Sequence, residues 1–212
     1  MAQHLHQLSC SVDEVAKFDG ANWVCAEYTG TNNGVFPPQT ERFTDNGDET
    51  ITDNQTGLMW EKKLAADGTD GGNCTDSIQA YRDVRCVNNL YSWTDLADGD
   101  DTNADGMAFT ELLSTLNQKA TDDPESSCFA NHCDWRVPRL VELRSIVFEQ
   151  YPCSTSPCID GIFGPTAANF YWSSSTFAAV PTGAWGVLFS DGFIDAGNKL
   201  NSFHVRAVRG RR

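Results

Sequence analysis

The residues with the clearest chemical potential in this sequence are its eight cysteines. In chain order they form four neighbouring pairs, namely Cys10 and Cys25, Cys74 and Cys86, Cys128 and Cys133, and Cys153 and Cys158. Many connectivities are open to eight cysteines, so pairing of neighbours is a prediction from proximity. The last two pairs could instead bind zinc, with His132 as a further ligand. We favour disulfides, because the intervening segments are typical of closed surface turns, and disulfides indicate an oxidising compartment.

A second set of candidate ligands lies in the acidic run at residues 98–106. The first, third, fifth and sixth positions of a calcium-binding loop are occupied by Asp101, Asn103, Asp105 and Gly106. The twelfth position is Leu112, and the nearest carboxylate, Glu111, comes one residue early. We therefore expect a solvated acidic loop, with a weak calcium site as the alternative, and no other cofactor.

The sequence shows no recognisable catalytic set. Its four histidines, at positions 4, 6, 132 and 204, have no spacing that suggests an acid–base pair with a carboxylate. A glycine-rich phosphate loop and a nucleophile elbow are also missing. These observations favour a binding module over an enzyme.

The elements that would carry a binding surface are clearest near the C-terminus. Residues 185–190 alternate as in a half-buried strand, with Trp185, Val187 and Phe189 on one face. Asp191-Gly192 then predicts a hairpin turn. The return strand should place Ile194 inward.

The opposite face of this hairpin carries unexpected apolar residues. Leu188, Phe193 and Asp195 should face away from the core, and Leu200 and Phe203 should follow in an exposed loop. Scattered surface hydrophobes are common, which is one interpretation. The other is a contact surface, because apolar residues among Ser, Asn, Asp and Gly are typical of binding patches.

The rest of the chain supplies a platform for this surface. We expect a small disulfide hairpin at residues 1–28, a linker at 29–40 and a main domain at 41–212. Residues 42–61 are typical of a β-meander in which Trp60 is buried. Apolar stripes at helical spacing predict helices over about 107–118 and 139–148.

Charge and hydropathy limit the partners. The net charge is −14, and the acidic residues concentrate before residue 134. We therefore expect neither nucleic acid nor an anionic membrane as a partner. No apolar run is long enough to span a bilayer, and the first residues lack the pattern of a signal peptide. A removed leader, or transport on a virion, would reconcile this start with an extracellular setting.

Several strings considered together resemble one known family. They are RFTDNGDETITDNQTGLMW (42–60), YSWTD (91–95), CFANHCDWRVPRLVELRSIV (128–147), PCIDGIFGPTAANFYWSSS (157–175) and VRAVRG (205–210). They are similar to the Lcl C-terminal domain, the C-terminal domain family of collagen-like bacterial adhesins, over about residues 40–210. The family usually has Thr after Pro138 as a helix N-cap. Arg139 stands there in this chain, so that cap must be supplied differently or is lost.

The resemblance implies an α+β, C-type-lectin-like fold with short twisted antiparallel sheets, two main helices and long disulfide-stapled loops. Domains of this type also serve as variable proteins of diversity-generating retroelements, in which codons near the C-terminus are rewritten. On that basis the predicted variable, ligand-binding surface consists of Phe177, Val180, Gly186, Leu188, Ser190, Phe193, Asp195, Ala196, Gly197, Asn198, Leu200, Asn201, Ser202, Phe203 and His204.

The expected function is that of a receptor or adhesin module. It would present this surface to a protein or glycan on another cell, from a cell surface or virion, with Phe193 and Phe203 as apolar anchors. Collagen-like relatives and tail fibres imply a homotrimer. One alternative is an oxidoreductase like the formylglycine-generating enzymes, which would need two free cysteines. The other is a glycosaminoglycan-binding adhesin, whose basic patch would include Lys199, Arg206, Arg209, Arg211 and Arg212.

Overall fold

The computed structural model describes residues 42–79, 82–95, 100–118, 128–148 and 152–210, together with the backbone of two strands before residue 28. The chain divides into two compact units, Met1–Thr40 and Glu41–Arg212. In the first unit, β1 (Glu14–Phe18) pairs antiparallel with β2 (Trp23–Glu27), so the hairpin expected there is present. The expected linker and the Cys10–Cys25 bridge lie outside the described residues. The limits of a separate hairpin domain stay a prediction.

The first strands of the second unit and its last strand belong to one four-stranded antiparallel sheet. The predicted meander is present as β3 (Phe43–Asp45), β4 (Thr50–Asp53) and β5 (Leu58–Glu61). The last strand, β11 (Val208–Arg209), returns to pair with β5, giving the order β11-β5-β4-β3. Val208 lies opposite Trp60, whose side chain is fully buried as expected.

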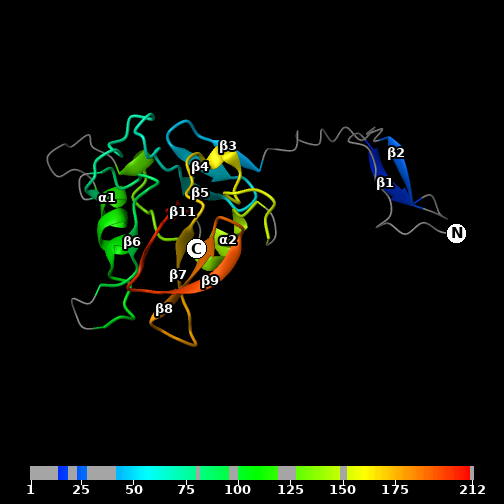
Figure 1. Ribbon diagram of the computed structural model, residues 1–212. Helices are drawn as coiled ribbons and strands as arrows, with labels where there is room; N and C mark the ends of the chain where they lie inside the picture. Colours follow the sequence, from blue (N-terminus) through cyan, green and yellow to red (C-terminus); the bar gives the residue numbers. More distant parts are fainter. Residues whose placement is uncertain are drawn as a thin grey trace. The chain divides into compact units, whose positions relative to one another are not determined.

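The second main sheet carries the C-terminal hairpin (Figure 1). Its strands are β7 (Phe170–Thr176), β8 (Gly183–Leu188) and β9 (Phe193–Asn198), in the order β7-β8-β9. Thus β9 is an edge strand. The chain then forms β10 (Ser202–Phe203), which pairs with β6 (Tyr91–Ser92).

Helices are few and short. The predicted helix at 107–118 is present as a π-helical segment, η3 (Ala108–Leu112), that continues into α1 (Leu113–Asn117). The predicted helix at 139–148 is shorter, with α2 at Leu140–Ser145. Short 3-10 turns lie at η4 (Phe129–Asn131) and η5 (Gly161–Phe163). The described domain is therefore α+β, built from small antiparallel sheets and few helices, and none of its helices is long and apolar enough to cross a membrane.

The N-terminus of α2 is capped from outside the helix. The Ser175 hydroxyl, from β7, accepts the Leu140 N–H at 3.0 Å, and the Glu142 carboxylate accepts the Arg139 N–H at 2.8 Å. Burial alone would raise the pKa of Glu142, but hydrogen bonds from Arg136 and Arg139 outweigh it and lower that pKa to about 2. The lost threonine cap is thus replaced by a tertiary contact.

Two hydrophobic cores lie on opposite faces of the β7-β8-β9 sheet. Tyr171 and Val187 enter one core, which includes the meander and α2. Their neighbours Phe170, Trp172 and Ala184 enter the other core, with Trp93, Leu112 and Leu116 among its members. Because successive residues of a strand point to opposite faces, both faces of β7 and β8 are covered.

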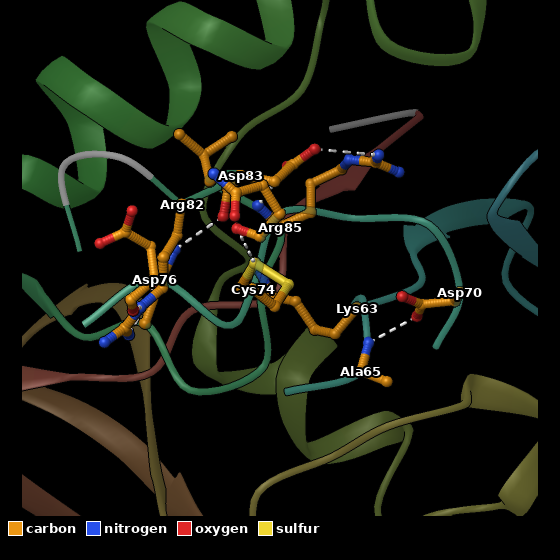
Figure 2. Close-up of a disulfide and its surroundings, with 12 residues drawn as sticks. Lys63, Ala65, Asp70, Cys74, Asp76, Arg82, Asp83 and Arg85 are labelled. Carbon is orange, nitrogen blue, oxygen red and sulfur yellow. Dashed lines mark hydrogen bonds and ion pairs between the residues drawn. A yellow bond between two sulfur atoms is a disulfide. The ribbon is translucent and has the colours of Figure 1, made fainter. Parts of the chain in front are cut away.

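Three of the four predicted disulfides are formed, namely Cys74–Cys86, Cys128–Cys133 and Cys153–Cys158. Their sulfur atoms are therefore not available to zinc. Figure 2 shows the Cys74–Cys86 bridge among the side chains of Arg82, Asp83 and Arg85. Arg82 donates to the Asp76 carbonyl at 2.6 Å, so this long segment without regular secondary structure is tied by both covalent and polar contacts.

A buried polar cluster anchors the C-terminal string. Arg206 donates to the carbonyls of Glu61, Phe163 and Pro165, and the Glu61 carboxylate pairs with Lys63 at 2.7 Å. Arg206 and Lys199 are almost fully buried, and Arg209 pairs with Asp134. These three residues therefore do not form the open basic patch of the glycosaminoglycan alternative, and Arg211 and Arg212 lie outside the described residues.

Candidate binding surface

The C-terminal hairpin is present, with a longer turn than predicted. β8 and β9 pair in register from Gly183 opposite Asn198 to Leu188 opposite Phe193. Residues 189–192 form the connection, so Phe189 lies in the turn and not in a strand, although its side chain is buried as expected. The Asp191 carboxylate accepts the Phe193 N–H at 3.0 Å, which fixes the start of β9.

The expected inner face is largely correct. Val187 is fully buried, and Ile194 packs against the core that contains it. Trp185 is only half-buried, and its ring packs against Phe177, with ring centroids 4.8 Å apart. The loop after β7, which contains Phe177 and Val180, therefore lies beside β8.

Two glycines of the predicted variable surface belong to the scaffold. A Cβ at Gly186 would overlap the Phe170 ring and the Tyr171 carbonyl. At Gly197 it would lie 2.8 Å from Cη2 of Trp172 and 2.9 Å from Cε2 of Phe203. The prediction that these positions can vary is wrong, because aromatic rings occupy the space in which a side chain would begin.

Phe203 and Leu188 are also less exposed than predicted. The Phe203 ring packs on Phe170 and Trp172, with centroids 4.7 and 4.9 Å apart, and Leu188 contacts the same core. Phe203 was expected to be an exposed anchor and is instead partly buried. The reason is that the second core covers the face of the sheet that the sequence pattern left open.

His204 was also predicted to be exposed, and it is buried. Its side chain is only 6% exposed, and its ring stacks on Tyr171 with centroids 5.1 Å apart. Burial, aided by the positive charge of Lys63, lowers the pKa of His204 to about 4, so the ring is neutral near pH 7. Its Nδ1 atom has no hydrogen-bond partner within the described part of the chain. His204 therefore belongs to the core.

Most of the exposed remainder lies along β9 and the loop that follows it. Phe193 and Leu200 are 43% and 44% exposed, and Val180, in the loop before β8, is 50% exposed. Asp195, Asn198, Asn201 and Ser202 are also exposed, whereas Ser190 and Ala196 are partly buried. We call Phe193, Asp195, Asn198, Leu200 and Asn201 the outer strip.

Lys199 fixes the loop that carries two of the five strip residues, Leu200 and Asn201. Its ammonium donates to the Thr102 carbonyl at 2.7 Å and the Thr176 hydroxyl at 3.1 Å, and it lies 3.8 Å from the Trp93 ring centroid. Burial lowers the pKa of Lys199. The loop is also closed on itself, since the Asn198 side chain accepts the Leu200 N–H at 2.9 Å. Leu200 and Asn201 are thus presented on an anchored turn.

The acidic run lies next to this anchor. The Asp105 carboxylate accepts hydrogen bonds from the Thr94 hydroxyl and the Asp95 N–H, both at 2.9 Å. Asp100 accepts from Thr102 in the same way. Across residues 42–210, apart from the gaps named above, no three His, Cys, Asp or Glu side chains converge as a metal site would require.

One feature near the strip was not predicted. Leu90, Met107, Glu111, Gln79 and Ser202 line a surface groove with a volume of about 340 Å³. The signal available in the sequence was the spacing of Met107 and Glu111, which places both on one helix face beside the apolar stripe. Leu90 and Gln79 come from a segment without periodicity, so their position could not be inferred.

The fold and this surface define an α+β domain stapled by disulfides, with exposed apolar and polar residues on an edge strand and its loop. The family model of the Lcl C-terminal domain matches residues 49–209. The chain therefore belongs to the Lcl C-terminal domain family. No curated protein sequence and no solved structure matches it.

Proposed function

We propose that this domain is an adhesin-like binding module that displays the outer strip to a protein or glycan on another cell. The observation that carries the proposal is the separation between the strip and the scaffold. The exposed residues are Phe193, Asp195, Asn198, Leu200 and Asn201. Between them, Gly197 lies against the Trp172 and Phe203 rings and Lys199 against the Trp93 ring. Apolar and hydrogen-bonding groups side by side on a rigid support are typical of recognition surfaces.

The finer features of the proposal rest on family membership and on this separation. A C-type-lectin-like fold agrees with the small antiparallel sheets, few helices and disulfides. Diversification by a retroelement is compatible with the exposed positions, because none of their side chains is a member of either core. It would not be tolerated at Gly186, Gly197 or His204. The proposed variable surface is therefore narrower than the one inferred from the sequence.

We place the domain outside the cell, at a cell surface or on a virion, which agrees with three disulfides. The six cysteines described with side chains are all bridged, so they provide no thiol pair for the oxidoreductase alternative. A homotrimer stays a proposal drawn from the family resemblance.

The test is a comparison of three fluorescently labelled proteins on a panel of cells and on a glycan array. They are the native chain, a variant with all five outer-strip residues replaced by Ala, and a control with Val141→Ala and Phe148→Ala. The control removes apolar side chains that are 70% and 59% exposed elsewhere on the domain. Binding that is lost in the strip variant and retained in the control supports the proposal. Equal binding by all three proteins contradicts it.

A further inference from the structure

The groove beside the outer strip has walls that are held firmly. The Gln79 side chain clamps the Leu90 backbone, donating to its carbonyl at 2.6 Å and accepting its N–H at 3.0 Å. On the other wall, the Met107 N–H donates to the Ser92 hydroxyl at 3.1 Å. Ser92 lies opposite Ser202 in the β6–β10 pair. The groove is therefore a formed feature of the fold and not a gap between loose loops.

Apolar side chains are exposed around this groove. Leu90 and Met107, which line it, are 37% and 36% exposed. Apolar side chains gathered at a concave site, with polar groups at its rim, are typical of sites that bind an apolar group of a partner.

Glu111 gives the groove a charge that is not neutralised. Its side chain is partly buried, yet it forms no hydrogen bond or ion pair with any described residue. The three carboxylates that are buried in the described domain are ion-paired, Asp53 with Arg42, Glu61 with Lys63 and Glu142 with Arg136. A carboxylate that is partly removed from water favours a nearby cation, because such contacts strengthen as the local dielectric falls.

We propose that this groove binds a protein segment that carries one apolar side chain next to a lysine or arginine. The apolar side chain lies between Leu90 and Met107, and the cation pairs with Glu111. An anionic glycan would meet Glu111 and a domain of net charge −14, so charge complementarity favours the basic segment. The groove shares only Ser202 with the predicted variable surface, and the inference stands apart from the function proposed for the outer strip.

The test uses the full chain with ¹³C-labelled methionine methyl groups. The probe is the capped peptide acetyl-Gly-Lys-Leu-Lys-Gly-amide, and its two controls carry Glu in place of Lys, or Ser in place of Leu. We expect the Met107 methyl signal to move in a saturable way, with a dissociation constant of about 1 mM, as befits a single anchor. The Met59 methyl, on β5, should not move. Both control peptides should bind at least about threefold more weakly.

Two variants assign the cation contact. Glu111→Gln should weaken binding by about three- to tenfold, the loss of one charge-assisted contact. Asp195→Asn removes an exposed carboxylate from the outer strip and should have almost no effect. An unchanged Met59 signal shows that each variant is folded. A stationary Met107 signal, equal binding of the acidic peptide, or equal effects of the two variants would overturn the proposal. Phe193→Ala changes the outer strip and should leave peptide binding intact. Failure of the groove proposal can therefore be distinguished from failure of the function proposed for the outer strip.

Discussion

The Lys199 ammonium lies 3.8 Å from the centroid of the Trp93 ring, and this contact fixes the loop that presents Leu200 and Asn201. We expect Lys199→Met to destabilise the domain by about 1–3 kcal/mol, because the Thr102 carbonyl and Thr176 hydroxyl lose a buried donor. Lys62→Met is the control. This substitution removes a partly exposed ion pair with Asp45 and should lower the free energy of unfolding by about 1 kcal/mol or less. Denaturant melts of both variants measure the difference, and equal losses would refute the anchoring role.

Substitution of Gly197 tests whether aromatic rings occupy the space above β9. Gly197→Ala should destabilise by about 1–3 kcal/mol, because the new methyl would meet Trp172 and Phe203. Gly161 is the matched control, since a Cβ there has nothing within 4 Å. Gly161→Ala should be neutral or stabilise slightly, through the reduced entropy of the unfolded chain. A neutral or stabilising Gly197→Ala would show that this part of the face is open.

His204 should give the domain a specific pH dependence. Its pKa is about 4 in the folded chain, below the value of about 6.5 expected when unfolded. As the pH falls, the unfolded state therefore binds the proton on His204 at a higher pH than the folded state does. The free energy of unfolding should decrease by about 3 kcal/mol between pH 6.5 and pH 4. The lowered pKa of Glu142 makes stability depend on pH in a lower range, between the usual pKa of a glutamate and about 2.

Replacement of His204 by Phe keeps a ring against Tyr171 and removes the titrating group. We expect this variant to lose most of the slope of unfolding free energy between pH 6.5 and 4. His132→Gln, which changes a histidine outside the two cores, should keep the slope. Melts of the two variants at several pH values provide the measurement. An undiminished slope in His204→Phe would mean that another group is responsible.

The Cys153–Cys158 bridge should hold the β8–β9 turn. The Cys153 N–H donates to the Asp191 carbonyl at 2.8 Å, and the Cys158 N–H donates to the Phe189 carbonyl at 2.6 Å. Replacing both cysteines by Ser should cost about 2 kcal/mol. It should also speed amide hydrogen exchange at residues 189–193. The same change at Cys128 and Cys133, which have the same sequence separation, should leave exchange in this turn unchanged. Equal exchange in both variants would contradict the contact.

Local signals predicted much of this fold. The meander, the C-terminal hairpin, both helical segments and three disulfides follow from periodicity, turn residues and spacing within short stretches. These features depend on neighbours in the sequence. The cap supplied by Ser175 depends on a distant strand, and the segment after α2 is held by the distant Cys158, whose carbonyl accepts the Phe148 N–H. No local pattern could reveal either contact.

The main error concerned the outer face of the hairpin. Alternation identifies which residues share a face, but not whether a second layer covers that face. Phe203 and Trp172 belong to a core completed by residues near Trp93 and Leu112, all far from the hairpin in sequence. This second core covers Leu188 and Phe203, and stacking on Tyr171 covers His204, so these three residues are less exposed than predicted. Phe193, Asp195 and Leu200, on the edge strand and its loop, are exposed as predicted.

The most direct test of the account measures the stability of the outer-strip variant, in which Phe193, Asp195, Asn198, Leu200 and Asn201 are all replaced by Ala. If scaffold and display surface are separate, its free energy of unfolding should change by no more than about 0.5 kcal/mol per site, and by about 1 kcal/mol at Asn198, whose side chain accepts the Leu200 N–H. Trp172→Ala, at a fully buried position, should cost about 3–5 kcal/mol. Denaturant unfolding of the two proteins gives the comparison without knowledge of the ligand. If the five-site variant unfolds as readily as Trp172→Ala, the strip is part of the core, and the binding-surface account is wrong.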